Sequence, residues 1–396
     1  MRQCDSGVAL RTLFQNVTLE GRGISSKNMN KLVISNLLHR PVRSLISVLA
    51  VAIEVVMILS TVAMLYGQLD DNKTRTSGVG ADMIVRPPNA SFLSAVSSAA
   101  VPAAIAPRVL AKLPHVVAAS PVITNLSTGK SLETLWGIDY ESFDALKPFV
   151  YMSGGPFQGP YDLIVDDVFA QADNGHHVGE TLMVLNHKFR ICGIVEHGKG
   201  GRKFLPITTL GELMSSEGKA TLFYLRSDDI RNQELIRKEI LATPGMGDYQ
   251  VQTMQEWLSM MTPEHLPGFT PAVNSVVTIA AIVGFLVIFQ AMYTAILERT
   301  REIGILKSLG ASRSAIVAVV LRETILLTVT GILLGIFMTY GVRAFMNWRM
   351  PTIFFEMTPE WMIRGSLIAF IGGVAGAVYP ALKASNKDPI DALAYE

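Results

Sequence analysis

The sequence predicts an α-helical membrane protein with four transmembrane helices and a large α+β extracytoplasmic domain inserted between helices 1 and 2. Of its 396 residues, 49% are hydrophobic and only 17% are charged, whereas soluble proteins carry about 25% charged residues. Four apolar segments each approach the roughly 20 residues that cross a bilayer. The stretch 67–271 separates the first of these segments from the other three and is polar enough to fold in water.

The four apolar segments divide the chain. They are Ser44–Tyr66, Ala272–Leu297, Thr324–Val342 and Gly365–Leu382. The first is too long for the apolar part of a signal peptide and has no small-residue cleavage site after it, so we interpret it as a retained anchor. The predicted segments are a disordered tail or mis-assigned start (1–28), an amphipathic helix with the first span (29–66), the extracytoplasmic domain (67–271), the second span (272–297), a cytoplasmic coupling helix (298–313), the third span (314–342), a short outer loop (343–364), the fourth span (365–382) and a cytoplasmic tail (383–396).

Basic residues near the span ends predict the orientation, because they accumulate on the cytoplasmic side. They are Lys31, Arg40, Arg43, Arg299, Arg301, Lys307, Arg313, Lys383 and Lys387. We therefore expect an inner-membrane protein with both termini cytoplasmic. This assignment is mildly opposed by Arg343, Arg349 and Arg364 in and beside the loop 343–364. With four spans and both ends inside, however, that loop must lie outside.

The extracytoplasmic stretch mixes strand and helix patterns. Short segments rich in Val, Ile, Leu and aromatic residues, bounded by Gly, Pro or Asp, predict strands; these are 81–87, 116–123, 131–139, 161–167, 180–197 and 220–227. Apolar residues at helical spacing predict helices over 106–114 and 230–245. Residues 151–160 read as a turn-rich loop and 197–203 as a hairpin loop.

The stretch "LERTREIGILKSLGASRSAI", 297–316, joins two spans and is charged. Its residues favour a helix from about Leu297, with Ile296, Thr300, Ile303 and Leu306 on one face. Gly310 is expected to end this helix, because glycine adopts the left-handed conformation easily, and Ser312 to cap a second helix that begins near Arg313. Taken alone, the stretch is equally a basic surface helix that only sets orientation.

The same stretch resembles the cytoplasmic coupling segment of MacB/FtsX-like ABC transporter permeases. The end of the chain, "GGVAGAVYPALKASNKDPIDALAYE" (372–396), is similar to the last span and tail of that family. "MNKLVISNLLHRPVRSLISVLAVAI" resembles its first helix and "ADMIVRP" the start of its outer domain. The resemblance covers 29–396.

This resemblance implies a dimer of two copies, or of two related permeases, that acts as a lever. A separate cytoplasmic ABC ATPase would dock on the coupling segment and drive the outer domains. The residues expected to dock are Glu298, Arg299, Arg301, Glu302, Ile303, Gly304, Ile305, Leu306, Lys307, Leu309, Gly310 and Ala311.

The chain itself is expected to be non-catalytic and without a cofactor. The nearest match to the phosphate-binding G-x-x-x-x-G-K-[ST] motif, 124–131, has Thr124 in place of the first glycine. ATP and Mg are therefore expected on the partner ATPase, although macrolide exporters of the family carry theirs fused at the N-terminus. His176, His177, His187 and His197 lack the spacing of a metal site, and Cys4 and Cys192 are too few for a disulfide framework.

Five residues within the spans stand out. Glu54 lies in the middle of the first span, where a carboxylate is costly. It either contacts substrate, a proton or a cation in the dimer interface, or is a protonated carboxyl that packs helices; both readings stay open. Gly331 with Gly335, and Gly372 with Gly376, form small-residue pairs that favour close helix packing, within or between subunits.

The leading functional hypothesis is a permease that exports or extracts a hydrophobic substrate or membrane lipid, with a periplasmic adaptor if the cell has two membranes. The alternative is an ATP-driven signalling switch that activates an outer partner such as a cell-wall hydrolase. A membrane-anchored enzyme is disfavoured, since no catalytic constellation stands out. A net charge of +1 gives no reason to expect nucleic acid binding.

Overall fold

The computed structural model describes residues 41–88, 90, 101–128, 132–172, 175–266 and 268–386. The chain divides into two compact units. We call them the helical unit, which comprises the described parts of 1–61, 274–342 and 357–396, and the sheet unit, which comprises those of 62–273 and 343–356.

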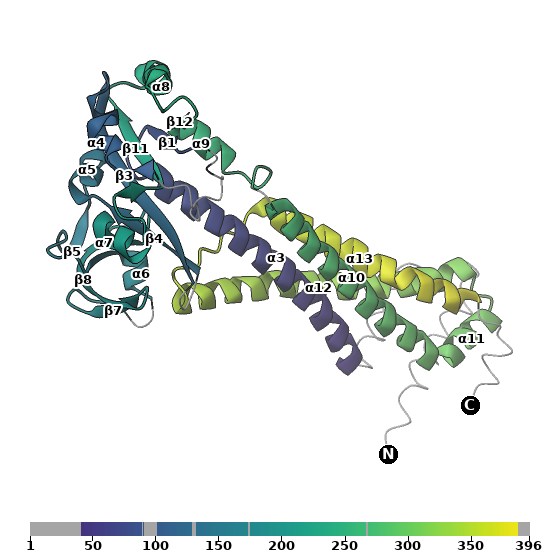
Figure 1. Ribbon diagram of the computed structural model, residues 1–396. Helices are drawn as coiled ribbons and strands as arrows, with labels where there is room; N and C mark the ends of the chain where they lie inside the picture. Colours follow the sequence, from purple (N-terminus) through teal and green to yellow (C-terminus); the bar gives the residue numbers. More distant parts are fainter. Residues whose placement is uncertain are drawn as a thin grey trace. The chain divides into compact units, whose positions relative to one another are not determined.

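Four described helices are long and apolar enough to cross a membrane, which confirms the predicted number of spans. They are α3 (Pro41–Ser77), α10 (Phe269–Glu298), α12 (Arg313–Arg349) and α13 (Pro359–Asn386). A short helix, α11 (Thr300–Ser308), joins α10 to α12 (Figure 1). Apolar side chains of all four long helices form one core in the helical unit, including Val55, Ile288, Val320 and Ala377.

The helices extend beyond the apolar segments that revealed them. α3 continues past Tyr66 to Ser77, and α12 continues past Val342 to Arg349. Hydropathy marks only the part of a helix suited to lipid, whereas helix formation follows residue propensity and continues through polar residues. α13 begins at Pro359, before the expected Gly365, because proline is well suited to the first turn of a helix.

Glycines set the spacing of two helix pairs within the chain. A Cβ on Gly331 or Gly335 of α12 would lie 2.7 Å from the Cβ of Val51 or Val55 in α3. A Cβ on Gly376 of α13 would lie 2.7 Å from the Phe285 carbonyl oxygen in α10, while at Gly372 the nearest such distance is 3.6 Å. Three of these four positions therefore admit only glycine at the observed separation.

The sheet unit is built on a mixed β-sheet (Figure 1). Its strand order is β12-β1-β11-β3-β4-β9-β6-β8-β5, and β7 pairs with β8. The strands of this sheet are β1 (Met83–Arg86), β3 (Val116–Thr128), β4 (Leu132–Ile138), β5 (Tyr151–Gly154), β6 (Asp162–Asp166), β7 (Thr181–Val184), β8 (His187–Val195), β9 (Lys203–Pro206), β11 (Leu222–Ser227) and β12 (Gln250–Thr253). Short β2 (Val101–Pro102) and β10 (Lys219–Ala220) pair separately.

Short helices pack on the sheet and complete an α+β fold, as predicted. They are α4 (Ile105–Arg108), α5 (Tyr140–Leu146), α6 (Asp167–Ala170), α7 (Ile207–Leu213), α8 (Gln233–Ala242) and α9 (Met254–Met260), with 3-10 turns η2 (Leu110–Lys112) and η3 (Ile230–Asn232). Phe143 of α5, Leu210 of α7 and Ile236 of α8 each belong to a different apolar cluster of the sheet unit.

Three segments differ from the sequence prediction. The expected loop 151–160 contains strand β5, which pairs antiparallel with β8; its glycines and prolines hid a strand that is only four residues long. Segment 197–203 is not a hairpin loop, because β8 and β9 each pair with β6 rather than with each other. The helix expected over 106–114 breaks at Val109 into α4 and η2, since a β-branched residue weakens a short helix.

Segment 180–197 forms two strands rather than one. β7 and β8 make a hairpin whose turn residues, Leu185 and Asn186, have φ values of 47° and 63°. Positive φ at both positions is the geometry of the tight turn that matches strand twist. The helix predicted over 230–245 is observed as η3 followed by α8.

Candidate functional site

The candidate site in the helical unit is α11 with the turn that follows it. The backbone leaves helical geometry at Arg299, where φ is −108° and ψ is 16°, so α10 and α11 are separate helices. The Thr300 hydroxyl donates to the carbonyls of Ile296 and Leu297 at 3.2 and 2.9 Å. These bonds occupy carbonyls that the end of α10 would otherwise leave unpaired.

The turn after α11 has the geometry that the sequence predicts. Gly310 has a φ of +92°, and its amide donates to the Lys307 carbonyl at 3.0 Å. The Ala311 amide donates to the Leu306 carbonyl, also at 3.0 Å, and the two bonds together form a Schellman motif. The Ser312 hydroxyl accepts from the Ala315 amide at 3.3 Å and caps α12. Both predicted helix ends are therefore confirmed.

One face of α11 is attached to the helical unit. The Arg299 guanidinium pairs with the Glu323 carboxylate of α12 at 3.2 Å, and both side chains are largely buried. The Lys307 ammonium donates to the Ser385 carbonyl of α13 at 2.9 Å. Gly304 is buried between these two contacts. α11 is thus held to α12 at its start and to α13 near its end.

The other face of α11 is open. The exposed fractions of Leu306 and Leu309 are 39% and 60%, and Arg301 and Glu302 are exposed beside them. Of the residues that the sequence places on one face, Ile296 and Thr300 are buried, Ile303 is half-buried and Leu306 is exposed. Gly304 is buried on the side of α11 opposite this exposed surface.

The structure therefore divides the predicted docking residues into two groups. Six are exposed: Glu298, Arg301, Glu302, Leu306, Leu309 and Gly310. Six are buried or half-buried: Arg299, Ile303, Gly304, Ile305, Lys307 and Ala311. The exposed group can meet a partner, whereas Arg299 and Lys307 make contacts that position the helix.

Sequence reasoning did not identify Glu323, which lies on α12 and is 8% exposed. A carboxylate directly before an apolar segment, here Thr324–Val342, that follows a basic stretch is a signal for a buried ion pair. Its partner could not be chosen from the sequence, because the stretch offers several arginines and lysines.

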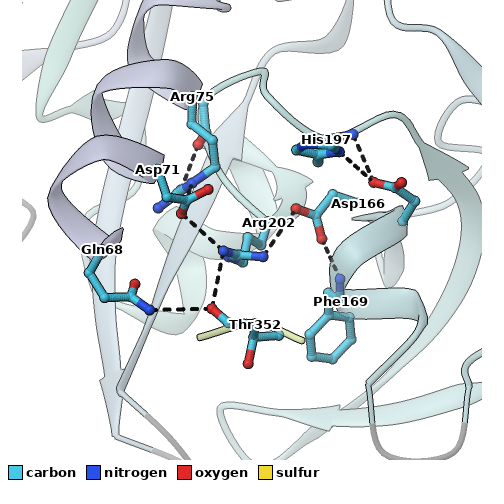
Figure 2. Close-up of polar contacts among 10 residues, drawn as sticks. Gln68, Asp71, Arg75, Asp166, Phe169, His197, Arg202 and Thr352 are labelled. Carbon is cyan, nitrogen blue, oxygen red and sulfur yellow. Dashed lines mark hydrogen bonds and ion pairs between the residues drawn. The ribbon is translucent and has the colours of Figure 1, made fainter. Parts of the chain in front are cut away.

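A second polar centre lies in the sheet unit, around Arg202 (Figure 2). Its Nη2 donates to the Asp71 carboxylate at 2.9 Å and to the Thr352 carbonyl at 3.2 Å. Its Nη1 lies 3.7 Å from Asp166 Oδ2. One side chain therefore joins the end of α3, the segment 343–356 and the β6–α6 corner.

Further contacts fix this Arg202 centre. Arg75 donates to Asp71 at 2.9 Å and to the Gly200 carbonyl at 2.7 Å, and the Gly200 amide donates back to the Arg75 carbonyl at 2.7 Å. The Glu356 amide donates to the Ala63 carbonyl at 3.0 Å. The last turns of α3 and the segment 343–356 are therefore attached to each other and to the sheet.

The charge of Asp166 is the least well balanced by polar contacts in the Arg202 centre. Its Oδ1 accepts from the Phe169 amide at 2.7 Å and caps α6, while its Oδ2 has only the 3.7 Å contact with Arg202 among the described residues. Burial raises the pKa of Asp166 to about 6, although Arg202 and the Phe169 amide lower it. Proton release here charges a buried site.

The remaining predicted site residues have simpler surroundings. Glu54 is buried in α3 against Gly284 of α10, inside the chain. His176 and His197 contact Glu180 and Asp167. Within the described residues, no group of three His, Cys, Asp or Glu side chains could hold a metal ion. Thr124, the first residue of the incomplete phosphate-binding motif, lies within strand β3 opposite Trp136.

Two family models match the chain. The model described as the MacB-like periplasmic core domain matches residues 44–243, and the one described as the FtsX-like permease C-terminal region matches residues 274–389. The two matches together cover both units.

Curated relatives include several permeases. The uncharacterized ABC transporter permease YknZ of Bacillus subtilis is 36% identical over 154 residues, 37% of each chain. The uncharacterized ABC transporter permease MJ1507 of Methanocaldococcus jannaschii is 29% identical over 54% of this chain and 57% of its own. The macrolide export ATP-binding/permease protein MacB of Acinetobacter baylyi is 23% identical over 92% of this chain and 59% of its own. The chain thus spans less than two thirds of these relatives.

Solved structures give weaker likenesses. The periplasmic region of MacB from Actinobacillus actinomycetemcomitans aligns with a TM-score of 0.36 and 16% identity, covering 45% of this chain and 92% of that one. The extracellular domain of YknZ aligns with a TM-score of 0.34 and 12% identity, covering 43% and 98%.

Proposed function

The chain belongs to the MacB/FtsX-like family of ABC transporter permeases, and on this premise we propose that it transmits the ATP-driven motion of a separate cytoplasmic ATPase to its outer domain. This motion of the outer domain drives the export or extraction of a hydrophobic substrate or lipid. The permease acts as a dimer of two copies or of two related chains in the inner membrane, with both termini cytoplasmic. ATP and Mg belong to the ATPase.

The observation that carries this proposal is the two-sided surface of α11. Its outward face presents Leu306 and Leu309 with the charged Arg301 and Glu302, a mixture suited to a protein partner because apolar anchors supply affinity and charges supply orientation. Its inward face is attached to α12 by Arg299 and to α13 by Lys307. A force on α11 therefore reaches two spans directly.

The Arg202 centre supports the second half of the proposal. α3 and α12 each run from the helical unit into segments that belong to the sheet unit. Arg202 binds Asp71 near the end of α3 and Thr352 just after α12. Within the sheet unit, Arg202 therefore attaches the end of α3 and the segment that follows α12 to the sheet through buried polar contacts.

The test is affinity purification of the tagged full chain from its native membrane, in mild detergent with an ATP analogue, followed by mass spectrometry. We expect a P-loop ATPase in the eluate. Leu306→Asp combined with Leu309→Asp should lower its yield at least about tenfold, since removing apolar anchors from an interface typically costs about 2 kcal/mol. Leu235→Asp is the matched control, because Leu235 is an exposed leucine of α8.

The outcomes separate the alternatives. An adaptor protein beside the ATPase favours export, while a cell-wall hydrolase in its place favours the signalling switch. An eluate without an ATPase, or equal ATPase recovery with the α11 variant and the Leu235→Asp control, overturns the coupling role of α11.

A further inference from the structure

The last two turns of α12 are exposed on nearly all sides. The helix continues past the apolar segment Thr324–Val342 and ends at Arg349. Among residues 343–350, only Met346 is half-buried, and every other side chain is exposed. The helix end therefore presents its side chains to the surroundings of the protein rather than to a core.

This helix end carries apolar side chains that water solvates poorly. Phe345, Trp348 and Met350 are 58%, 78% and 49% exposed. The rings of Phe345 and Trp348 lie edge to face with their centroids 6.3 Å apart. Trp136 and Trp257 of the same sheet unit are buried in its core. An exposed tryptophan at the end of an apolar span is typical of the membrane interface, where an amphipathic ring meets both lipid and water.

The charge of the same helix end is only positive. Arg343 and Arg349 are exposed, and neither forms an ion pair with a described residue. The sequence has no Asp or Glu between Glu323 and Glu356. Two guanidinium groups without acidic neighbours favour an anionic partner, and their planar donor geometry suits a phosphate group.

The length of the exposed helix end matches the headgroup layer of a bilayer. At 1.5 Å per residue, residues 343–349 rise about 10 Å, whereas the polar layer on each side of the hydrocarbon core is roughly 5–8 Å thick. If the hydrocarbon core ends near Val342, the seven residues after it cross this layer. This holds for either orientation of the chain, because 343–356 belongs to the sheet unit and lies on that unit's side of the membrane.

We propose that residues 343–350 bind the anionic headgroup layer of the leaflet on the side of the sheet unit. Phe345 and Trp348 lie among the glycerol and upper acyl groups, while Arg343 and Arg349 donate hydrogen bonds to lipid phosphates. The two arginines are about 9 Å apart along the helix axis and about 120° apart around it, so they contact two lipids rather than one. This contact also explains why basic residues occur at the end of α12 opposite α11.

The segment after the helix end is fixed within the sheet unit. The Met350 amide donates to the Met346 carbonyl at 2.7 Å, and the Thr352 carbonyl accepts from Arg202 at 3.2 Å. Lipid contact at 343–350 therefore acts on a helix end that is attached to the Arg202 centre. It needs neither ATP nor a partner at α11, so it stands or falls independently of the proposed function.

The experiment uses the full chain in phosphatidylcholine nanodiscs that contain one of two photoreactive lipids. These are a phosphatidylglycerol and a phosphatidylcholine with the same diazirine near the carbonyl of one acyl chain, and mass spectrometry locates the cross-links. We expect phosphatidylglycerol to label 343–350 more strongly than phosphatidylcholine. Arg343→Gln and Arg349→Gln should each lower the phosphatidylglycerol label about fivefold, the usual contribution of one basic residue at an anionic surface, and leave the phosphatidylcholine label within about twofold.

Two further variants separate charge from apolar contact. Arg108→Gln removes an exposed arginine of α4 in the same unit and should leave both labels unchanged. Phe345→Ala combined with Trp348→Ala should lower both labels, because the rings serve either headgroup. All these variants replace exposed side chains, so the fold is kept.

Three outcomes would overturn the proposal. One is equal labelling of 343–350 by the two lipids in the wild type, and another is a phosphatidylglycerol label that neither arginine variant lowers. The third is the absence of any lipid label at 343–350. In that case, cross-links from this segment to a second copy of the chain would identify the chain itself as the partner.

Discussion

Arg299 and Arg202 are both buried arginines that hold separate segments of one unit, but they act over very different distances along the chain. Arg299 and Glu323 are 24 residues apart, separated by α11, the turn after it and the first turns of α12. Arg202 is 131 residues from Asp71 and 150 from Thr352. The first contact stabilises a local helical hairpin, and the second closes the topology of a whole unit. The comparison suggests that the local contact shapes a surface, whereas the long-range contact maintains the fold.

The comparison predicts that loss of Arg202 has the largest effect on stability. Arg202→Met takes one of two arginines from Asp71, which keeps Arg75, and takes the nearest cation from Asp166; the two carboxylates are 5% and 1% exposed. Removing one partner of a buried ion pair costs about 3–5 kcal/mol. We expect a large fall in the unfolding temperature of the full chain in detergent, with early proteolysis in 343–356.

The control for Arg202 is Arg231→Met. Its guanidinium pairs with Asp229, but the Arg231 side chain is 88% exposed, so the water around it replaces the lost contact. Similar unfolding temperatures for the two variants would mean that the Arg202 centre does not maintain the fold, and the contrast with Arg299 would disappear.

A second prediction concerns the pH dependence of the Arg202 centre. The pKa of Asp166 rises from 3.8 to about 6 through burial. The protonated form therefore stabilises the folded state fully below about pH 4, and this contribution is lost as pH rises through 6. Asp166→Asn cannot ionise. The unfolding free energy of the variant, relative to wild type, should increase by up to about 3 kcal/mol between pH 4 and pH 7.

The measurement is denaturant unfolding of both proteins at several pH values, with an intrinsic tryptophan signal. Asp229→Asn serves as the control, because Asp229 is exposed and its pKa is lowered by Arg231, so its difference from wild type should not grow over this range. A pH-independent difference for Asp166→Asn would show that Arg202 fully compensates the carboxylate.

The third prediction tests the local arginine. Arg299→Met leaves Glu323 buried and unpaired, and Glu323→Met removes the buried carboxylate that Arg299 binds. Each single change should cost about 2 kcal/mol, at the low end for a buried charge pair. The double variant Arg299→Met with Glu323→Met should be more stable than either single one, since no charge remains unpaired. Thermal unfolding in detergent measures all three, and additive losses would contradict the ion pair.

Arg299 and Arg202 also illustrate which features of the structure can be predicted from the sequence and which cannot. The four spans, the α+β sheet unit and the α11 turn follow from local patterns. These are the length of the apolar segments, short stretches rich in Val, Ile, Leu and aromatic residues, and a glycine placed after a helix. Gly310 and Ser312 could be assigned because their roles depend on neighbours within a few residues. The resemblance to the permease family rests on the same stretch.

Long-range contacts could not be predicted in this way. Arg202 lies in a glycine-rich segment that reads as a hairpin loop, and its partners are set by the insertion of β6 between β8 and β9. The exposure of Leu306 at the end of α11 could not be predicted either, because its helical spacing places it on the same face as the buried Ile296 and Thr300. The lack of a partner for Glu54 among the described residues appeared only once α10 was placed beside it.

The smallest expected effect belongs to the feature that the sequence predicts best. Gly310 has a φ of +92° with open space around its Cα, so Gly310→Ala introduces no clash and only forces alanine into a left-handed conformation, at a cost of about 1 kcal/mol. Gly341→Ala is the matched control, because Gly341 lies within α12, also in open space, and alanine there favours the helix by up to about 1 kcal/mol. We expect opposite shifts in unfolding temperature from the two changes.

If the Schellman turn positions Leu309 for a partner, Gly310→Ala also lowers ATPase recovery in the purification assay while Gly341→Ala does not. Equal recovery would confine the role of this turn to stability, and α11 would then be positioned by Arg299 and Lys307 alone.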